Sequence, residues 1–211
     1  MPPEALALLC DLDGTLVDSR PEVDAAWRAF AALHGLDVDA VLAATFAGPS
    51  REVVRTVAPW LDAEAEAARV EGWQVETAAR SRAIDGAADL LEAWPRERVA
   101  IVTSGGRELA RARLAGAGLP APAVLVSADD VRAGKPDPEG YRPAAALLGV
   151  PPERCLALED APAGIAAARA AGARTVAVAT THDPAELAAA DRVVGSLADL
   201  ALVPAAPSER G

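Results

Sequence analysis

Short apolar runs alternate with longer helical stretches over the second half of the chain. The apolar runs are almost continuous in Val, Ile, Leu and Ala, which is typical of strands covered on both faces. They lie at 98–103, 123–127, 155–159, 174–179 and 191–195. Helical stretches are expected between them, at about 106–117, 138–148, 162–171 and 184–190. This alternation predicts an α/β fold, a Rossmann-like doubly wound parallel sheet with right-handed crossovers.

The N-terminal run LALLCDLD continues this pattern, but the chain then departs from it. Residues 18–85 have the apolar spacing of helices throughout, with no good strand, and they hold three of the four tryptophans. We therefore predict a core made of residues 1–17 and 86–211, and an inserted all-helical cap made of residues 18–85. From about Val203 the chain is rich in Pro, Ala and Ser, and a frayed end is expected there.

Composition narrows the class of protein. The chain is 52% apolar but only 3% aromatic, so alanine, leucine and valine must build the interior. The formal net charge of −11 argues against nucleic acid as a partner, and it means that an anionic substrate needs a locally positive pocket. There is neither a signal-peptide pattern nor an apolar run near the ~18 residues of a membrane span. We expect a soluble cytoplasmic protein with no membrane partner, monomeric or at most dimeric.

Two acidic pairs follow predicted strands. Asp11 and Asp13 close the first strand, and side chains two apart on a strand point to the same side. Carboxylates held this close repel each other and need a cation or a shared proton between them. Glu159 and Asp160 close a later strand before a helix that begins at Pro162. Each pair also has a purely structural explanation, as a tight turn or as a helix cap.

Two further features suggest a site for an anion. Thr103 and Ser104 end a strand and are followed by Gly105 at the start of a helix, where free amides favour a bound phosphate. Lys135 is the only lysine among 20 cationic residues. Lysine is a compact point charge, whereas arginine is a wide planar fork. Taken alone, a lysine between a glycine and a proline is more often a solvated residue of a turn.

All four clusters follow predicted strands, and ligands of parallel sheets bind where the strands end. Together they therefore indicate one site more strongly than any of them does alone. Carboxylates of this kind hold Mg²⁺, which commonly keeps several waters and contacts substrate phosphate. An oxygen nucleophile, a proton shuttle and cations around the phosphoryl oxygens are what phosphoryl transfer requires. The sequence therefore indicates a phosphate-ester substrate and a magnesium cofactor.

The stretches DLDGTL, VTSGG, GKPDPEGY and LALEDAPAGI stand in this order, with a helical insert after the first. They resemble the four motifs of the haloacid dehalogenase superfamily over nearly the whole chain. Within it, EDAPAGIAAARAAG and VAVATTHDPAEL are similar to the small sugar- and polyol-phosphate phosphatases, including the 2-deoxyglucose-6-phosphatase and glycerol-phosphate phosphatase types.

The resemblance implies a covalent mechanism. Asp11 would be the nucleophile that forms an aspartyl-phosphate, and Asp13 would act first as acid and then as base. Thr103 and Lys135 would contact the phosphoryl oxygens, assisted by the amides around Ser104 and Gly105.

The resemblance also implies the metal ligands. Mg²⁺ would be held by Asp11, Asp160 and the backbone carbonyl of Asp13. Glu159 would support these ligands without contacting the ion directly.

Specificity is expected to come from the insert. Arg51, in a cap loop of sequence GPSRE, is our candidate for contacting the sugar, although a surface arginine at a helix start fits as well. Asp18 is expected at the hinge and Trp27 in the core of the cap. Glu71 is assigned to a solvated helix face, and His182 to a loop without chemistry.

Three other activities share part of this pattern of residues. Haloacid dehalogenases have no need of a second acid such as Asp13. A β-phosphoglucomutase-like sugar-phosphate mutase would carry a cap histidine at the position of Val23, and valine cannot shuttle a proton. A phosphoacceptor signalling domain also groups Asp, Thr and Lys, but places its acceptor on a later strand and has no helical insert. Hydrolysis of a small phosphate monoester is therefore the favoured function.

Overall fold

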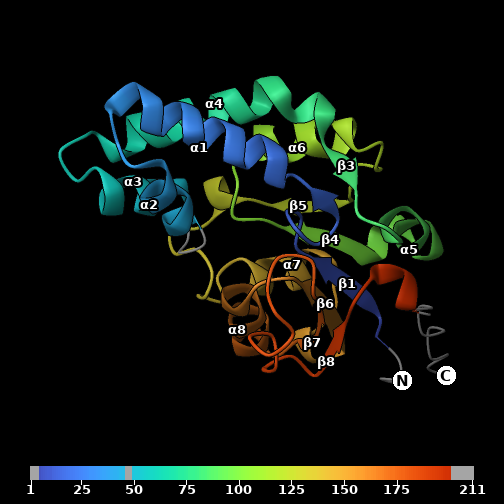
Figure 1. The fold of residues 1–211 in the computed structure, drawn as a ribbon. Coiled ribbons are helices and arrows are strands. Elements are labelled where there is room, and N and C mark those ends of the chain that lie inside the picture. Colours follow the sequence, from blue (N-terminus) through green and yellow to red (C-terminus); the bar gives the residue numbers. More distant parts are fainter. Residues whose placement is uncertain (1–4, 46–48, 201–211) are drawn as a thin grey trace, which may run out of the picture.

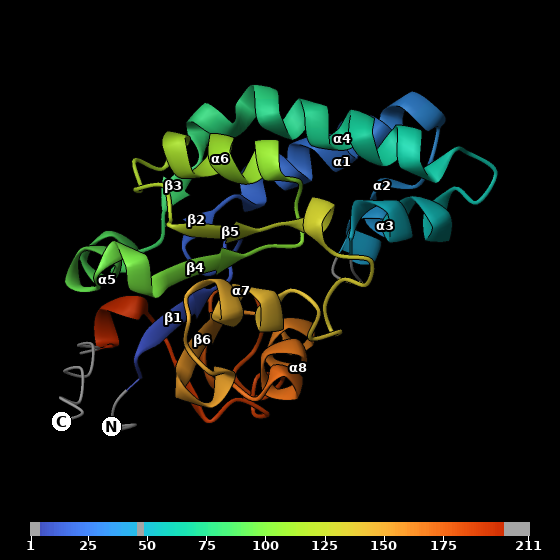
Figure 2. The same ribbon diagram turned by 180° about the vertical axis from the view of Figure 1, so that it is seen from behind.

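The computed structural model describes residues 5–45 and 49–200 of the 211-residue chain, so the expected frayed end lies outside the described residues. Within this part, six strands form one parallel sheet in the order β5-β4-β1-β6-β7-β8 (Figures 1 and 2). They are β1 (Ala7–Cys10), β4 (Val99–Val102), β5 (Val124–Val126), β6 (Cys155–Glu159), β7 (Arg174–Val178) and β8 (Arg192–Val194). The predicted parallel α/β sheet is confirmed.

Helices cover both faces of the sheet. On one face lie α5 (Ala87–Ala93) and α6 (Arg107–Gly116), and on the other α7 (Tyr141–Leu147) and α8 (Pro162–Ala171). Alternate residues of β1 serve the two faces, with Leu8 in the first hydrophobic cluster and Leu9 in the second. Because both faces are covered, most strand positions are apolar, which explains the nearly continuous apolar runs. Arg174 and Arg192, which begin β7 and β8, are exposed.

The last predicted helix is wrong. Residues 184–190 form successive turns, in which Leu187 N–H donates to the Pro184 carbonyl and Ala190 N–H to the Leu187 carbonyl. Leu187 is fully buried against Ile165 and Ala177. One buried leucine anchors this short segment, so it covers the sheet without completing an α-helix.

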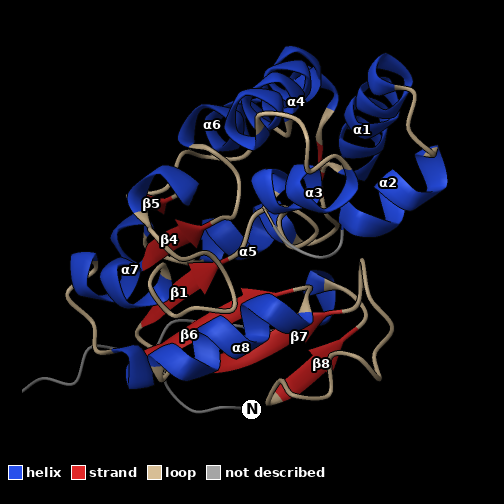
Figure 3. Cartoon of the chain, turned by 90° about the vertical axis from the view of Figure 1, so that its left-hand side faces the viewer, coloured by secondary structure: helices blue, strands red, loops and turns tan. Residues whose placement is uncertain are grey.

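The insert forms a helical layer at one end of the molecule (Figure 3). Its helices are α1 (Arg20–His34), α2 (Val38–Ala44), α3 (Ser50–Val57) and α4 (Ala63–Thr77). They enclose a hydrophobic cluster of their own that contains Trp27, as predicted. Among the described residues, no helix is long and apolar enough to cross a membrane. The domain limits at 17/18 and 85/86 stay a prediction.

The expectation that residues 18–85 contain no strand is wrong. The chain leaves the sheet through β2 (Val17–Asp18) and returns through β3 (Arg82–Ala83), and the two pair antiparallel. Each strand has two residues, which is too short for an alternating pattern to reveal. Their pairing reflects only that the outgoing and returning segments run side by side.

Helix α4 and the turn η2 (Ala78–Arg80) pack closely on α6 (Figures 1 and 2). The approach is tightest at Gly116, where a Cβ would lie 2.0 Å from the Ala78 carbonyl oxygen. A contact this short is incompatible with any side chain, so glycine permits the two helices to meet here.

We expect Gly116→Ala to lower the free energy of unfolding by about 1–3 kcal/mol, because the added methyl forces the helices apart. The matched control is Gly72→Ala on α4, where a Cβ meets nothing within 4 Å. That change should leave stability unaltered or raise it by up to about 1 kcal/mol, as alanine usually does in a helix. Urea unfolding measures both, and equal stabilisation of the two variants would contradict the close contact.

Candidate active site

The predicted site residues converge where the central strands end. Asp11 follows β1, Thr103 follows β4 and Asp160 follows β6. The chain runs from β1 outward through β4 and β5, then returns to build β6 on the opposite side of β1. Ligands of doubly wound sheets bind at this kind of reversal. All three residues line a cleft of about 920 Å³ that reaches α1 of the cap.

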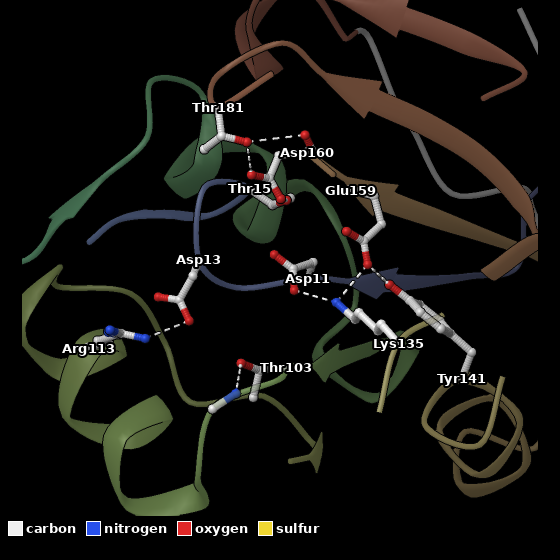
Figure 4. A network of polar contacts seen from close by, with 11 residues as sticks. Asp11, Asp13, Thr15, Thr103, Arg113, Lys135, Tyr141, Glu159, Asp160 and Thr181 are labelled. Atoms are coloured by element: carbon white, nitrogen blue, oxygen red, sulfur yellow. Dashed lines mark hydrogen bonds and ion pairs between the residues drawn. The ribbon is translucent and has the colours of Figure 1, made fainter. Parts of the chain in front are cut away.

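Lys135 bridges two buried carboxylates (Figure 4). Its Nζ lies 2.5 Å from Asp11 Oδ1 and 2.7 Å from Glu159 Oε1. The Tyr141 hydroxyl donates to the same Glu159 oxygen. The Lys135 side chain is only 12% exposed. Because the ammonium is enclosed on both sides, a guanidinium would not fit without moving a carboxylate.

Burial and mutual repulsion disfavour the ionised forms of the carboxylates in this cluster. Burial raises the pKa of Asp11 to about 7, although the Lys135 charge opposes this and the Glu159 charge adds to it. Burial, and then the Asp11 charge, raises the pKa of Asp160 to about 6. Burial would lower the pKa of Lys135, but Asp11 and Glu159 outweigh it and raise that pKa. One ammonium therefore does not offset the negative charge gathered here.

A divalent cation fits this arrangement. Oxygen atoms of Asp11, Glu159 and Asp160 lie within 4.8 Å of one another. Carboxylate oxygens are ligands for a hard cation such as Mg²⁺, and a positive ion would favour their ionised forms. Because Glu159 is already engaged by Lys135 and Tyr141, it suits a supporting position more than direct coordination.

Hydroxyl groups hold Asp160 in place. Thr15 Oγ1 donates to Asp160 Oδ1 at 3.3 Å, and Thr181 Oγ1 donates to Oδ2 (Figure 4). Gly14 has a φ of 84°, and a Cβ there would lie 2.1 Å from Asp160 Oδ2. The glycine of DLDG thus supplies both a left-handed turn and room for the opposite acid.

Asp13 points away from this cluster toward α6 (Figure 4). Its Oδ2 lies 2.6 Å from Arg113 Nη1, and its Oδ1 accepts a hydrogen bond of 2.7 Å from Ser19 Oγ. Arg113 Nη2 also donates to Gln74 Oε1 of α4 at 2.5 Å. Sequence reasoning missed Arg113, Ser19 and Gln74 as partners. A signal existed, because Arg113 stands at the apolar spacing of α6, one place before Leu114.

Thr103 and Ser104, two of the phosphate-binding candidates, follow β4 and line the cleft. Thr103 is buried, and its Oγ1 accepts from Gly105 N–H at 3.1 Å. Ser104 is exposed and also lines the cleft. Arg51 of α3 lines a small cavity together with Thr103, Ser104 and Lys135. Arg51 therefore lies beside the site on a cap helix, and its contact with the sugar stays a prediction.

Four other positions were assigned from sequence. Glu71 does not lie on a solvated face: it accepts from the Gly106 N–H of the core, and burial raises its pKa. His182 is in a loop, as expected, with Nδ1 3.1 Å from the Asp160 carbonyl oxygen. Asp18 lies on β2 at the crossing into the cap, and Val23 lines the cleft.

The chain belongs to the haloacid dehalogenase-like hydrolase family, whose family model matches residues 6–172. It is 40% identical over 197 residues to hexitol phosphatase A of Escherichia coli (strain K12), with 90% of each chain covered. It is 33% identical to glycerol-1-phosphate phosphohydrolase 2 of Saccharomyces cerevisiae, over 84% of this chain and 76% of that protein. The crystal structure of CbbY from Rhodobacter sphaeroides in complex with phosphate superposes with a TM-score of 0.82, at 29% identity and over 93% and 96% of the two chains.

The acidic cluster predicts that Mg²⁺ stabilises the fold. At about one hundred times its Kd, the ion should raise the free energy of unfolding by about 2.7 kcal/mol. This corresponds to roughly 5–10 °C in Tm for a chain of this size. Asp160→Asn should lose most of the shift, whereas Asp39→Asn on the exposed face of α2 should keep it. A thermal melt with and without Mg²⁺ tests this, and an equal shift in Asp160→Asn would refute the site.

Proposed function

We propose that this protein is a magnesium-dependent phosphatase that hydrolyses small sugar or polyol phosphate monoesters through an aspartyl-phosphate. The observation that carries the proposal is the contact of Asp11 with Lys135 at the end of β1, beside Asp160 and open to the cleft. The names of two relatives, a hexitol phosphatase and a glycerol-1-phosphate phosphohydrolase, support the substrate class.

The first step transfers the phosphoryl group to the protein. An oxygen of Asp11 attacks phosphorus in line, while the bond from phosphorus to the alcohol oxygen breaks. The electron pair of that bond stays on the alcohol oxygen, which takes the proton of the Asp13 carboxyl.

The second step releases phosphate. The Asp13 carboxylate takes a proton from water as the water oxygen attacks phosphorus. The bond between phosphorus and Asp11 breaks, its electron pair returns to the Asp11 carboxylate, and Asp13 is protonated for the next cycle. One residue thus serves as acid and then as base.

Positive charge around the phosphoryl oxygens comes from two sources. Lys135 is held beside the Asp11 carboxylate, and Thr103, whose hydroxyl can donate to a phosphoryl oxygen, lines the same cleft. Asp11, Asp160 and the backbone carbonyl of Asp13 would hold Mg²⁺. That ion would supply charge neutralisation at the phosphoryl oxygens.

A mutase is the nearest alternative. Such an enzyme returns the phosphoryl group to a second hydroxyl of the sugar, and the resemblance places its cap histidine at Val23. The valine side chain lines the cleft and offers neither a donor nor an acceptor, which favours transfer to water.

Phosphate release from a panel of esters tests the proposed function. We expect metal-dependent release from hexitol, hexose and glycerol phosphates, abolished by EDTA. Asp11→Asn should lower kcat by at least about 10³-fold, since no other group forms the covalent intermediate. Conversion of β-glucose 1-phosphate to the 6-phosphate without release would favour the mutase instead.

Lys135→Arg tests the enclosed ammonium. We expect kcat to fall by about 10²-fold or more, because the wider guanidinium displaces Asp11 or Glu159. Circular dichroism would verify that the variant is folded. Activity near that of the wild type would show that the site also accepts a guanidinium. It would contradict the claim that Asp11 and Glu159 leave room only for an ammonium.

A further inference from the structure

Helix α6 carries a charge on its buried face. The buried residues of this helix are Leu109, Ala110, Arg113 and Leu114. Arg113 is only 4% exposed. Removing a guanidinium from water costs several kcal/mol unless the charge is paired and its donors are satisfied. A leucine would pack at this position without that cost. The presence of an arginine must therefore be explained by the groups that it binds.

Arg113 has one partner in Asp13, the proposed acid, and one in Gln74 of the cap. Nη1 lies 2.6 Å from Asp13 Oδ2, and Nη2 donates to Gln74 Oε1 at 2.5 Å. The guanidinium is a rigid plane, so a bond that fixes one nitrogen also fixes the direction of the other. Gln74 is 4% exposed and has no access to water as an alternative donor.

Gln74 belongs to a continuous contact between α4 and α6. Glu71 accepts from Gly106 N–H, Gln74 accepts from Arg113, and the Ala78 carbonyl meets Gly116. These pairs occur in the same order along both helices. The position of the guanidinium is therefore set by how α4 lies on α6.

Asp13 is held from a second direction by the start of the cap. Ser19, which directly precedes α1, donates its hydroxyl to Oδ1 at 2.7 Å. Both carboxyl oxygens thus have a donor, one from α6 and one beside α1. Without them the Asp13 side chain, 28% exposed at the cleft, is free to adopt other rotamers.

We propose that Arg113 is a positioning residue for Asp13, and that Gln74 holds Arg113 in the orientation this requires. Acid catalysis then depends on how helix α4 of the cap packs on helix α6 of the core, at a distance from the reacting atoms. The inference rests on the proposed function, because it takes Asp13 as the acid.

The dependence on the leaving group tests this. An alkyl alcohol needs a proton as it leaves, whereas p-nitrophenolate leaves without one. For Arg113→Met, kcat/KM should fall by about 30-fold with glycerol or hexitol phosphate, less than the roughly 10²–10⁴-fold contribution of a general acid, because Asp13 is displaced and not removed. With p-nitrophenyl phosphate it should change by less than about 3-fold. A merely structural role lowers both values equally, because it reduces only the folded fraction.

Three further variants complete the design. Arg111→Met removes an exposed arginine of the same helix and should leave both esters unaffected. Gln74→Leu keeps every charge and should reproduce the selective loss at about 5-fold, which keeps the proposal testable if Arg113→Met does not fold. The double variant Gln74→Leu/Arg113→Met should be no slower than Arg113→Met alone, since both act through one contact.

The outcomes are distinct. A selective loss with the alkyl esters supports the positioning role. Equal losses of kcat/KM with both esters, or no loss in either Arg113→Met or Gln74→Leu, overturn the positioning role. If the wild type still releases phosphate in a metal-dependent reaction, the proposed phosphatase function stands. A wild type that releases phosphate from neither ester overturns the proposed function and this inference with it.

Discussion

The structure depends on the burial of three carboxylates and one ammonium at the end of a parallel sheet. Asp11, Glu159 and Asp160 converge because β1 and β6 are neighbours, although their residues are far apart in the chain. Lys135 offsets part of their charge, and the raised pKa values of Asp11 and Asp160 show that the balance is incomplete. The remaining negative charge favours the binding of a cation, and the Asp11 carboxylate is placed to attack the phosphorus of an ester. These two properties are the basis of the proposed chemistry.

The surrounding residues keep this cluster in one arrangement. Thr15 and Thr181 orient Asp160, and Tyr141 orients Glu159. Gly164 belongs to the same support, because a Cβ there would lie 2.0 Å from the Glu159 carboxyl group. Helix α8 can therefore approach the acid closely. The site is thus made precise by hydrogen bonds and close packing around the acids, and residues of the core supply them.

Sequence reasoning succeeded where a feature is local to one strand or to one turn after it. Asp11 and Asp160 could be placed because apolar runs predict strands, and the ends of parallel strands meet at one edge. The partners of Arg113 and Glu71 could not be predicted, although the apolar spacing of α6 marks Arg113 as buried. These partners depend on how α4 lies against α6, and helical periodicity does not specify which helices meet. The same limit explains β2 and β3, whose pairing requires the two ends of the insert to lie side by side.

The formation of a covalent phosphoryl group on Asp11 is the central claim, and the Asp13→Asn variant tests it most directly. With p-nitrophenyl phosphate, whose leaving group needs no acid, the variant should accept the phosphoryl group but lack the base that releases it. Intact-protein mass spectrometry followed by peptide mapping should then find one added phosphoryl group, on Asp11. Unmodified protein that nevertheless releases phosphate at the rate of the wild type would contradict the account, in which Asp13 is the base that frees Asp11.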